Sequence, residues 1–124
     1  MPSKDGTIRK KEITIIKQQM IRQYIEQIKK CVAKGHMTFA PRDKNVEFMR
    51  EYGLIEEDIK DIILDLNITN YFRGPTKDHN PKYNGDVWEF KYELDIDEYI
   101  TIYIKVRYNP PKELVCISFH LDEI

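Results

Sequence analysis

The C-terminal third of the chain alternates apolar and polar residues in three successive stretches. These stretches cover residues 86–94, 99–108 and 113–121. When polarity alternates at every second residue, one side chain points toward a core and the next points toward solvent. This pattern is typical of half-buried strands. The pattern predicts three consecutive strands in an antiparallel meander, with residues 109–112 forming its last turn.

The two faces of this predicted sheet differ in chemistry. One face is apolar and should be covered by helices; it comprises Trp88, Phe90, Tyr92, Leu94, Ile100, Ile102, Ile104, Val106, Val115, Ile117, Phe119 and Leu121. The other face should meet solvent, and it carries Glu89, Lys91, Glu93, Tyr99, Thr101, Tyr103, Lys105, Arg107, Cys116, Ser118 and His120. The second face therefore gathers groups that can transfer protons or bind phosphate.

Helical periodicity dominates the first half of the chain. Apolar residues spaced by three and four predict a helix over residues 15–34, a short helix over 43–52 and a third over 56–66. Gly35 and Gly53 are suitable C-terminal caps for the first and second of these helices. Residues 73–85 read as a long polar loop. The fold class is α+β: N-terminal helices packed on one face of a C-terminal antiparallel sheet, in one domain spanning residues 1–124, with 1–14 as a flexible extension.

Composition limits the class of protein without identifying it. The 124 residues are 41% hydrophobic and 33% charged, as expected for a soluble globular domain. Lys or Arg interrupts every apolar run, so we expect no membrane span. The N-terminal residues lack the apolar segment of a secretory signal, and we expect a cytoplasmic location. Cys31 and Cys116 match no metal spacing and are expected to be reduced and buried, with no metal or cofactor. Residues 1–34 contain nine Lys or Arg and three Asp or Glu, a net +6 that suits nucleic acid, an acidic partner or a solvated helix face.

The polar sheet face contains the groups that RNA cleavage by the substrate's own 2′-hydroxyl requires. A base must take the hydroxyl proton, an acid must protonate the departing 5′-oxygen, and cations must hold the phosphate. Glu89 and His120 are candidates for proton transfer. Cations that could bind phosphate are Arg73, Lys91, Lys105 and Arg107. Each also has a simpler interpretation, because charged and aromatic residues on a wet strand face are commonly solvated or merely favour strands.

Several short sequence segments together resemble the motility quorum-sensing regulator (MqsR) family of type II toxins. They are IKKCVAKG, NVEFMREYGLIEEDIKDIILDL, NYFRGP, DVWEF, IYIKV and CISFH, in the family's order over about residues 28–120. The resemblance implies a fold similar to RelE-type mRNA interferases. It also implies metal-independent cleavage of RNA, growth arrest and neutralisation by a cognate antitoxin.

The resemblance assigns roles to four residues. Arg73 stands where the family has Lys, and Tyr103 matches its strand tyrosine. Glu89 replaces the family's Gln, which offers a general base in place of an amide. His120 replaces its Lys, which offers an acid because free imidazole titrates near about 6.5. These four are the expected catalytic residues, with Lys105, Lys91 and Arg107 as substrate-binding residues.

Two other functions remain open from the sequence. A non-catalytic protein of the same fold could bind only a partner protein or RNA. A DNA-binding transcriptional module is disfavoured because no helix-turn-helix or basic recognition helix is evident.

Overall fold

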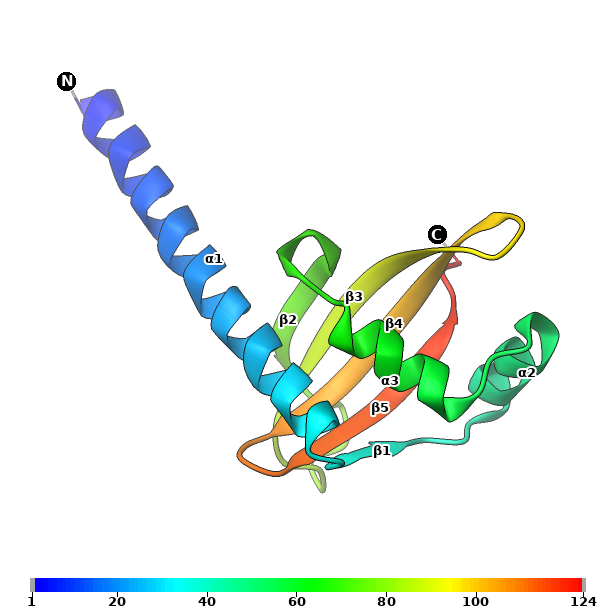
Figure 1. Ribbon diagram of the computed structural model, residues 1–124. Coiled ribbons are helices and arrows are strands. Elements are labelled where there is room, and N and C mark those ends of the chain that lie inside the picture. Colours follow the sequence, from blue (N-terminus) through cyan, green and yellow to red (C-terminus); the bar gives the residue numbers. More distant parts are fainter. Residues whose placement is uncertain (1, 124) are drawn as a thin grey trace.

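A computed structural model describes residues 2–123 of the chain, with side chains described from Thr14 to Glu123. Its elements are α1 (Pro2–Ala33), β1 (Met37–Phe39), α2 (Asp43–Tyr52), α3 (Glu56–Leu64), the 3₁₀ turn η1 (Ile68–Asn70), β2 (Tyr71–Lys77), β3 (Asp86–Asp95), β4 (Tyr99–Asn109) and β5 (Glu113–Leu121). The five strands form one sheet in the order β1-β5-β4-β3-β2. The three helices lie on one face of this sheet and leave the other open (Figure 1). The predicted α+β class is confirmed.

The three predicted strands are confirmed nearly to the residue as β3, β4 and β5, and they pair as antiparallel neighbours. Their apolar side chains meet the helices in a continuous core. Its largest fully buried members include Trp88, Phe90, Phe119, Ile59 and Ile63. Period-two alternation predicted these strands well because burying one sheet face requires it.

The helices depart from prediction mainly at their ends. α1 begins at Pro2, well before residue 15, while α2 matches its predicted span and α3 ends two residues early at Leu64. Gly35 and Gly53 have positive φ values of 77° and 68°, as expected at helix ends. The predicted flexible extension over residues 1–14 falls almost wholly outside the described side chains and stays a prediction. Among the described residues, no helix has both the length and the apolar character of a membrane span.

Two strands were missed by the sequence analysis. β1 is three residues long and pairs in parallel with β5, so it is too short to show alternation. β2 contains Gly74 and Pro75 and was wrongly predicted to be the start of a loop. It pairs with β3 through two register shifts on either side of Arg73. A Cβ on Gly74 would lie 2.7 Å from the Val87 oxygen, so glycine permits the close approach of β2 to β3.

A bulge in β5 changes which residues face the core. Lys105 pairs with Ser118 but its neighbour Val106 pairs with Cys116, so Ile117 is the extra residue. Cys116 consequently turns into the core with 0% exposure, whereas Val115 and Ile117 are only half-buried. The predicted faces of these three residues were therefore wrong, although both cysteines are free and buried as expected.

Asn45 of α2 holds this bulge in place. Its side-chain amide donates to the Ile117 oxygen at 2.9 Å and to the Ala40 oxygen at 3.0 Å. Its carbonyl accepts from the Phe119 amide at 3.0 Å. Asn45 is 1% exposed, so these bonds satisfy a buried amide and backbone groups that the bulge would otherwise leave unpaired. The bulge turns Cys116 into the core while His120 stays on the open face.

Candidate active site on the open face of the sheet

Strand register brings residues from four strands into two adjacent rows on the open face. In one row Arg73 of β2 pairs with Glu89, Glu89 with Lys105, and Lys105 with Ser118. In the next row Tyr103 lies between Lys91 and His120. All four expected catalytic residues therefore share one face of the sheet, opposite the helices.

Glu89 is the centre of a hydrogen-bonded cluster. Its Oε2 accepts from Arg73 Nε at 2.7 Å and its Oε1 accepts from Arg73 Nη2 at 2.8 Å, which is the two-pronged geometry of a guanidinium on a carboxylate. The Tyr103 hydroxyl donates a short bond to the same Oε1. Glu89 is 4% exposed, so the expectation that it is solvent-exposed was wrong. Arg73 shields it, because β2 forms a strand beside β3 where a loop was expected.

This cluster fixes the protonation state of its members. The bonds from Arg73 hold the pKa of Glu89 below its ordinary value, and they outweigh the opposing effect of burial. Burial, followed by the bond to Glu89, raises the pKa of Tyr103. The bonds to Glu89 raise the pKa of Arg73. Near neutral pH the cluster is thus an ionised carboxylate between a guanidinium and a neutral phenol.

A pocket of about 310 Å³ opens beside this cluster. Its walls come from β2, the following loop, β3 and β4, and its lining residues are Arg73, Thr76, Lys77, Asp78, His79, Val87, Glu89, Tyr103 and Lys105. The Arg73 side chain is 60% exposed even though it is paired, so it remains accessible to a ligand. Within the described part of the chain Lys105 lies outside ion-pair distance of any carboxylate, but its charge helps to lower the pKa of both Asp78 and Glu89. An anion entering the pocket therefore meets three cations, Arg73, Lys77 and Lys105, beside the carboxylates of Asp78 and Glu89.

His120 adjoins the cluster from the opposite side of Tyr103. The ring centroids of His120 and Tyr103 are 5.5 Å apart, and Nδ1 of His120 lies 2.9 Å from the Leu121 oxygen. His120 borders a different hollow, toward α2. Two strand spacings of about 4.8 Å and two residue rises of about 3.4 Å place the Glu89 and His120 Cα atoms roughly 12 Å apart. The two residues can therefore approach one phosphodiester only from its two sides.

Two of the expected substrate-binding residues are engaged elsewhere. Lys91 forms an ion pair with Asp122 at 3.1 Å and lies 4.2 Å from the ring centroid of Phe72. Arg107 forms an ion pair with Asp78 at 3.2 Å, and its side chain is only 10% exposed. Of the three expected binding residues, only Lys105 lines the pocket.

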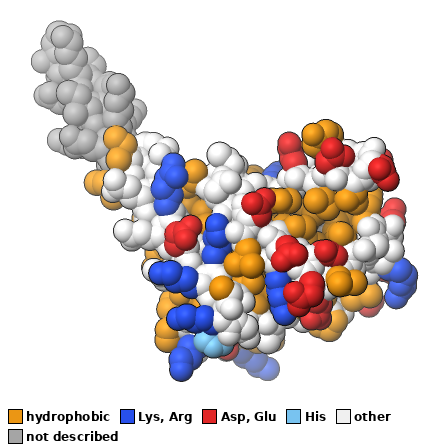
Figure 2. All heavy atoms as spheres, viewed as in Figure 1, with side chains coloured by type: hydrophobic (Ala, Val, Ile, Leu, Met, Phe, Trp, Pro, Cys, Tyr) orange, Lys and Arg blue, Asp and Glu red, His pale blue; other side chains and the backbone are white. Residues whose placement is uncertain are grey.

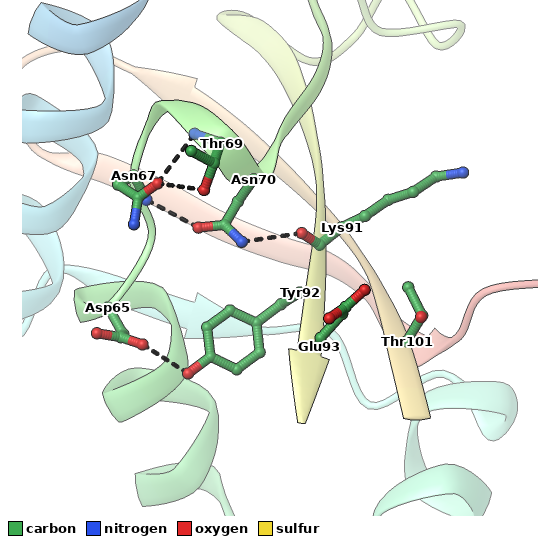
Figure 3. Close-up of a pocket in the computed structure, with 8 residues that line it drawn as sticks. All are labelled: Asp65, Asn67, Thr69, Asn70, Lys91, Tyr92, Glu93 and Thr101. Atoms are coloured by element: carbon green, nitrogen blue, oxygen red, sulfur yellow. Dashed lines mark hydrogen bonds between the residues drawn. The ribbon is translucent and has the colours of Figure 1, made fainter. Parts of the chain in front are cut away.

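A larger hollow of about 530 Å³ lies where β3 extends beyond β2 (Figure 3). Its polar groups are largely bonded to one another. The Tyr92 hydroxyl donates to Asp65 at 2.6 Å, Asn70 donates to the Lys91 oxygen at 3.1 Å, and Asn67 accepts from the Thr69 amide at 2.9 Å. The bond to Asp65 is the main reason that the pKa of Tyr92 is raised to about 12. These bonds fasten η1 and the end of α3 to β3, and the Lys91 side chain points away from them (Figure 3).

The length and polarity of the loop over residues 73–85 predict a functional role for it, since long polar loops in compact domains commonly carry function. The sequence analysis did not assign Asp78 or His79 to the site, and both line the pocket. Within the described residues, no three His, Cys, Asp or Glu side chains cluster as metal ligands would.

Comparison with known proteins gives one match. Residues 14–121 match the family model described as "Motility quorum-sensing regulator, toxin of MqsA". No curated protein and no solved structure matches the chain. The family match covers all five strands and begins earlier than the resemblance noted from the motifs. It includes every core residue that the structure describes in α1.

Proposed function

The chain belongs to the motility quorum-sensing regulator family of toxins, and on that basis we propose that it is an endoribonuclease that cleaves RNA by general acid–base catalysis without a metal ion. Its family is defined as the toxin of an antitoxin partner, MqsA. The observation that carries the proposal is the Arg73–Glu89–Tyr103 cluster, which lines a pocket with Lys105 on the open face of the sheet. Its place of action would be the cytoplasm, where mRNA is translated.

Arg73 is the residue that first meets the substrate in this mechanism. Its guanidinium is exposed, and a phosphate offers it the same two-pronged contact that Glu89 now provides. When Arg73 turns to the phosphate, Glu89 loses the main interaction that lowers its pKa. Substrate binding thereby converts a poorly basic carboxylate into a better proton acceptor.

The chemical step then needs no group from outside the chain. Glu89 takes the proton of the 2′-hydroxyl, and the 2′-oxygen forms a bond to phosphorus. Arg73 and Lys105 neutralise the charge that develops on the phosphate oxygens. The bond from phosphorus to the 5′-oxygen breaks as His120 donates a proton to that oxygen. The products are a 2′,3′-cyclic phosphate and a free 5′-hydroxyl.

The test is cleavage of single-stranded RNA by the purified chain in the presence of EDTA, with analysis of the product ends. Glu89→Gln and Arg73→Ala proteins, purified in parallel, control for contaminating ribonuclease, since only the unaltered chain should yield 2′,3′-cyclic ends at a substantial rate. Strict dependence on Mg²⁺ or Mn²⁺, or equal activity in all three preparations, would contradict the proposal.

A second candidate function is binding without catalysis. It is favoured by the same ion pair, because Glu89 already accepts three hydrogen bonds and a fully satisfied carboxylate can be purely structural. The two functions separate on one measurement. A protein that only binds arrests growth equally well with or without Glu89→Gln, whereas an enzyme loses most of its toxicity with that substitution.

Toxin function also requires neutralisation by the antitoxin. Basic side chains gather around the C-terminal end of α1, and acidic ones gather over α3 and the β3–β4 hairpin (Figure 2). This charged face and the open sheet face are the two surfaces that we expect an antitoxin to cover. Co-expression with the product of the neighbouring gene should restore growth and yield a co-purifying complex. A neighbour that neither binds nor rescues would oppose the assignment to a toxin–antitoxin pair.

A further inference from the structure

The loop between β2 and β3 folds back onto the open face and presents an aromatic ring there. Arg107 of β4 lies beneath it, with its guanidinium carbon 4.2 Å from the centroid of the Tyr83 ring. The guanidinium is fixed from the side by its ion pair with Asp78. Tyr83 is nevertheless 50% exposed. One face of the ring is thus supported by a nearly buried cation, and the tyrosine still presents a large surface to solvent.

The loop holds this arrangement without a ligand. The Asp78 carboxylate accepts from the Asn80 amide at 2.9 Å, and the Tyr83 amide donates to the Asn80 oxygen at 3.1 Å. At the end of the loop Gly85 has a φ of 102°, and a Cβ there would lie 2.6 Å from the Tyr108 oxygen. Glycine therefore allows the loop to lie directly against β4. The tyrosine is preorganised, so little conformational entropy is lost when something stacks on it.

The supported ring lies beside the candidate active site. Arg107 is two residues from Lys105 on the same strand and the same face, which places them about 7 Å apart along β4. Asp78 touches both features, because it lines the pocket and also anchors Arg107. A chain whose phosphate occupies the Arg73–Lys105 pocket would therefore carry its next nucleotide to Tyr83.

We propose that Tyr83, supported by Arg107 and Asp78, stacks on the unpaired base next to the phosphate bound in the Arg73–Lys105 pocket. This inference rests on the proposed function and adds a binding contact to it: an unstacked base beside the bond to be cleaved, held against the Tyr83 ring. An aromatic ring next to a cationic groove is the usual combination in proteins that hold single strands. Every base has a π-face, so this contact contributes affinity rather than sequence specificity.

The experiment measures binding and cleavage separately for Tyr83→Ala, Tyr83→Leu and Tyr83→Phe. Binding uses a short single-stranded RNA made uncleavable by a 2′-deoxy sugar at the reacting position. Removing the ring should weaken binding and raise KM by about 5- to 150-fold, the usual range for a stacked base, with little change in kcat. Leucine should not restore the affinity, whereas phenylalanine should restore most of it. Tyr99→Ala is the matched control, because Tyr99 is a 77% exposed tyrosine at the opposite end of β4 from Arg107.

An abasic site in the RNA identifies the contact directly. In the unaltered protein, an abasic sugar next to the reacting phosphate should weaken binding as much as Tyr83→Ala does. In the Tyr83→Ala protein it should have little further effect, since the partner of the base is already missing. Losses that simply multiply, or a Tyr83→Ala protein that binds like Tyr99→Ala, would overturn the inference. RNA that binds with this dependence on Tyr83 but is never cleaved would support the inference and refute the proposed catalysis.

Discussion

Replacing Glu89 by Gln tests whether the buried carboxylate stabilises the site through its bonds to Arg73 and Tyr103. Gln keeps the shape of Glu but has one acceptor oxygen and one NH₂ group. In the protein, Glu89 accepts from Arg73 at 2.7 and 2.8 Å and also from Tyr103. The Arg73 groups that contact the two carboxylate oxygens can only donate, so the NH₂ group of Gln must face a donor whichever way it turns. The substitution therefore removes at least one bond and the attraction between opposite charges.

The size of the effect follows from burial. Hydrogen bonds to charged groups contribute about 1.5–3 kcal/mol each. The Arg73 side chain is 60% exposed and can turn to water once Glu89 is neutral, so the loss should lie toward the lower limit. We expect Glu89→Gln to lower the free energy of unfolding by about 1–2 kcal/mol at pH 7. Glu93→Gln should change it by less than about 0.5 kcal/mol, because Glu93 is exposed on the same strand and face.

The contribution of Glu89 to stability should fall as the pH is lowered. The pKa of Glu89 is lower in the folded state than its ordinary value of 4.5, so its stabilising effect is complete above about pH 4.5 and is lost as the pH falls through the folded-state pKa. The difference in unfolding free energy between the unaltered protein and Glu89→Gln should therefore shrink below pH 4.5. Urea denaturation from pH 7 to pH 3 measures it. A difference that stays constant over this range, or one no larger than that of Glu93→Gln, would refute the reasoning.

Further predictions concern the remaining parts of the site. Arg73→Ala should weaken RNA binding and turnover, and Arg73→Lys should restore only part of both because an ammonium cannot make two parallel bonds; unchanged binding in Arg73→Ala would move the phosphate elsewhere. In the pH profiles, the acid limb of kcat should lie at higher pH than the acid limb of kcat/KM, because bound phosphate draws Arg73 away from Glu89 and the pKa of Glu89 then rises. Acid limbs at the same pH would exclude this transfer of Arg73 from Glu89 to the phosphate. His120→Ala should reduce kcat by about 10²- to 10⁴-fold, the usual loss for a general acid, and single-turnover kinetics measures that loss directly. Asn45→Ala should lower the free energy of unfolding by about 2–3 kcal/mol, because buried bulge groups lose their partners, and a loss below about 0.5 kcal/mol in urea denaturation would contradict the role given to Asn45.

The sequence determined the elements whose signals are local. Alternation with a period of two located β3, β4 and β5, and it placed Glu89, Tyr103 and His120 on one face because successive side chains must point to opposite sides of a strand. Helical spacing located α2, all of α3 and the C-terminal part of α1 in the same way. The ordered motifs were sufficient to identify the family, which the match over residues 14–121 then showed.

Only the tertiary structure decided how these residues are joined. The partner of Glu89 is Arg73, 16 positions away on a strand whose Gly and Pro hide it from any local pattern. The bulge that turns Cys116 into the core while His120 stays on the open face depends on Asn45, more than 70 positions away. Periodicity records whether a side chain is buried, but it carries no information about which distant group satisfies it. Burial of a charge is stable only where such a group is present, and so the environment of Glu89 and the support beneath Tyr83 arise only when the strands and the loop are assembled.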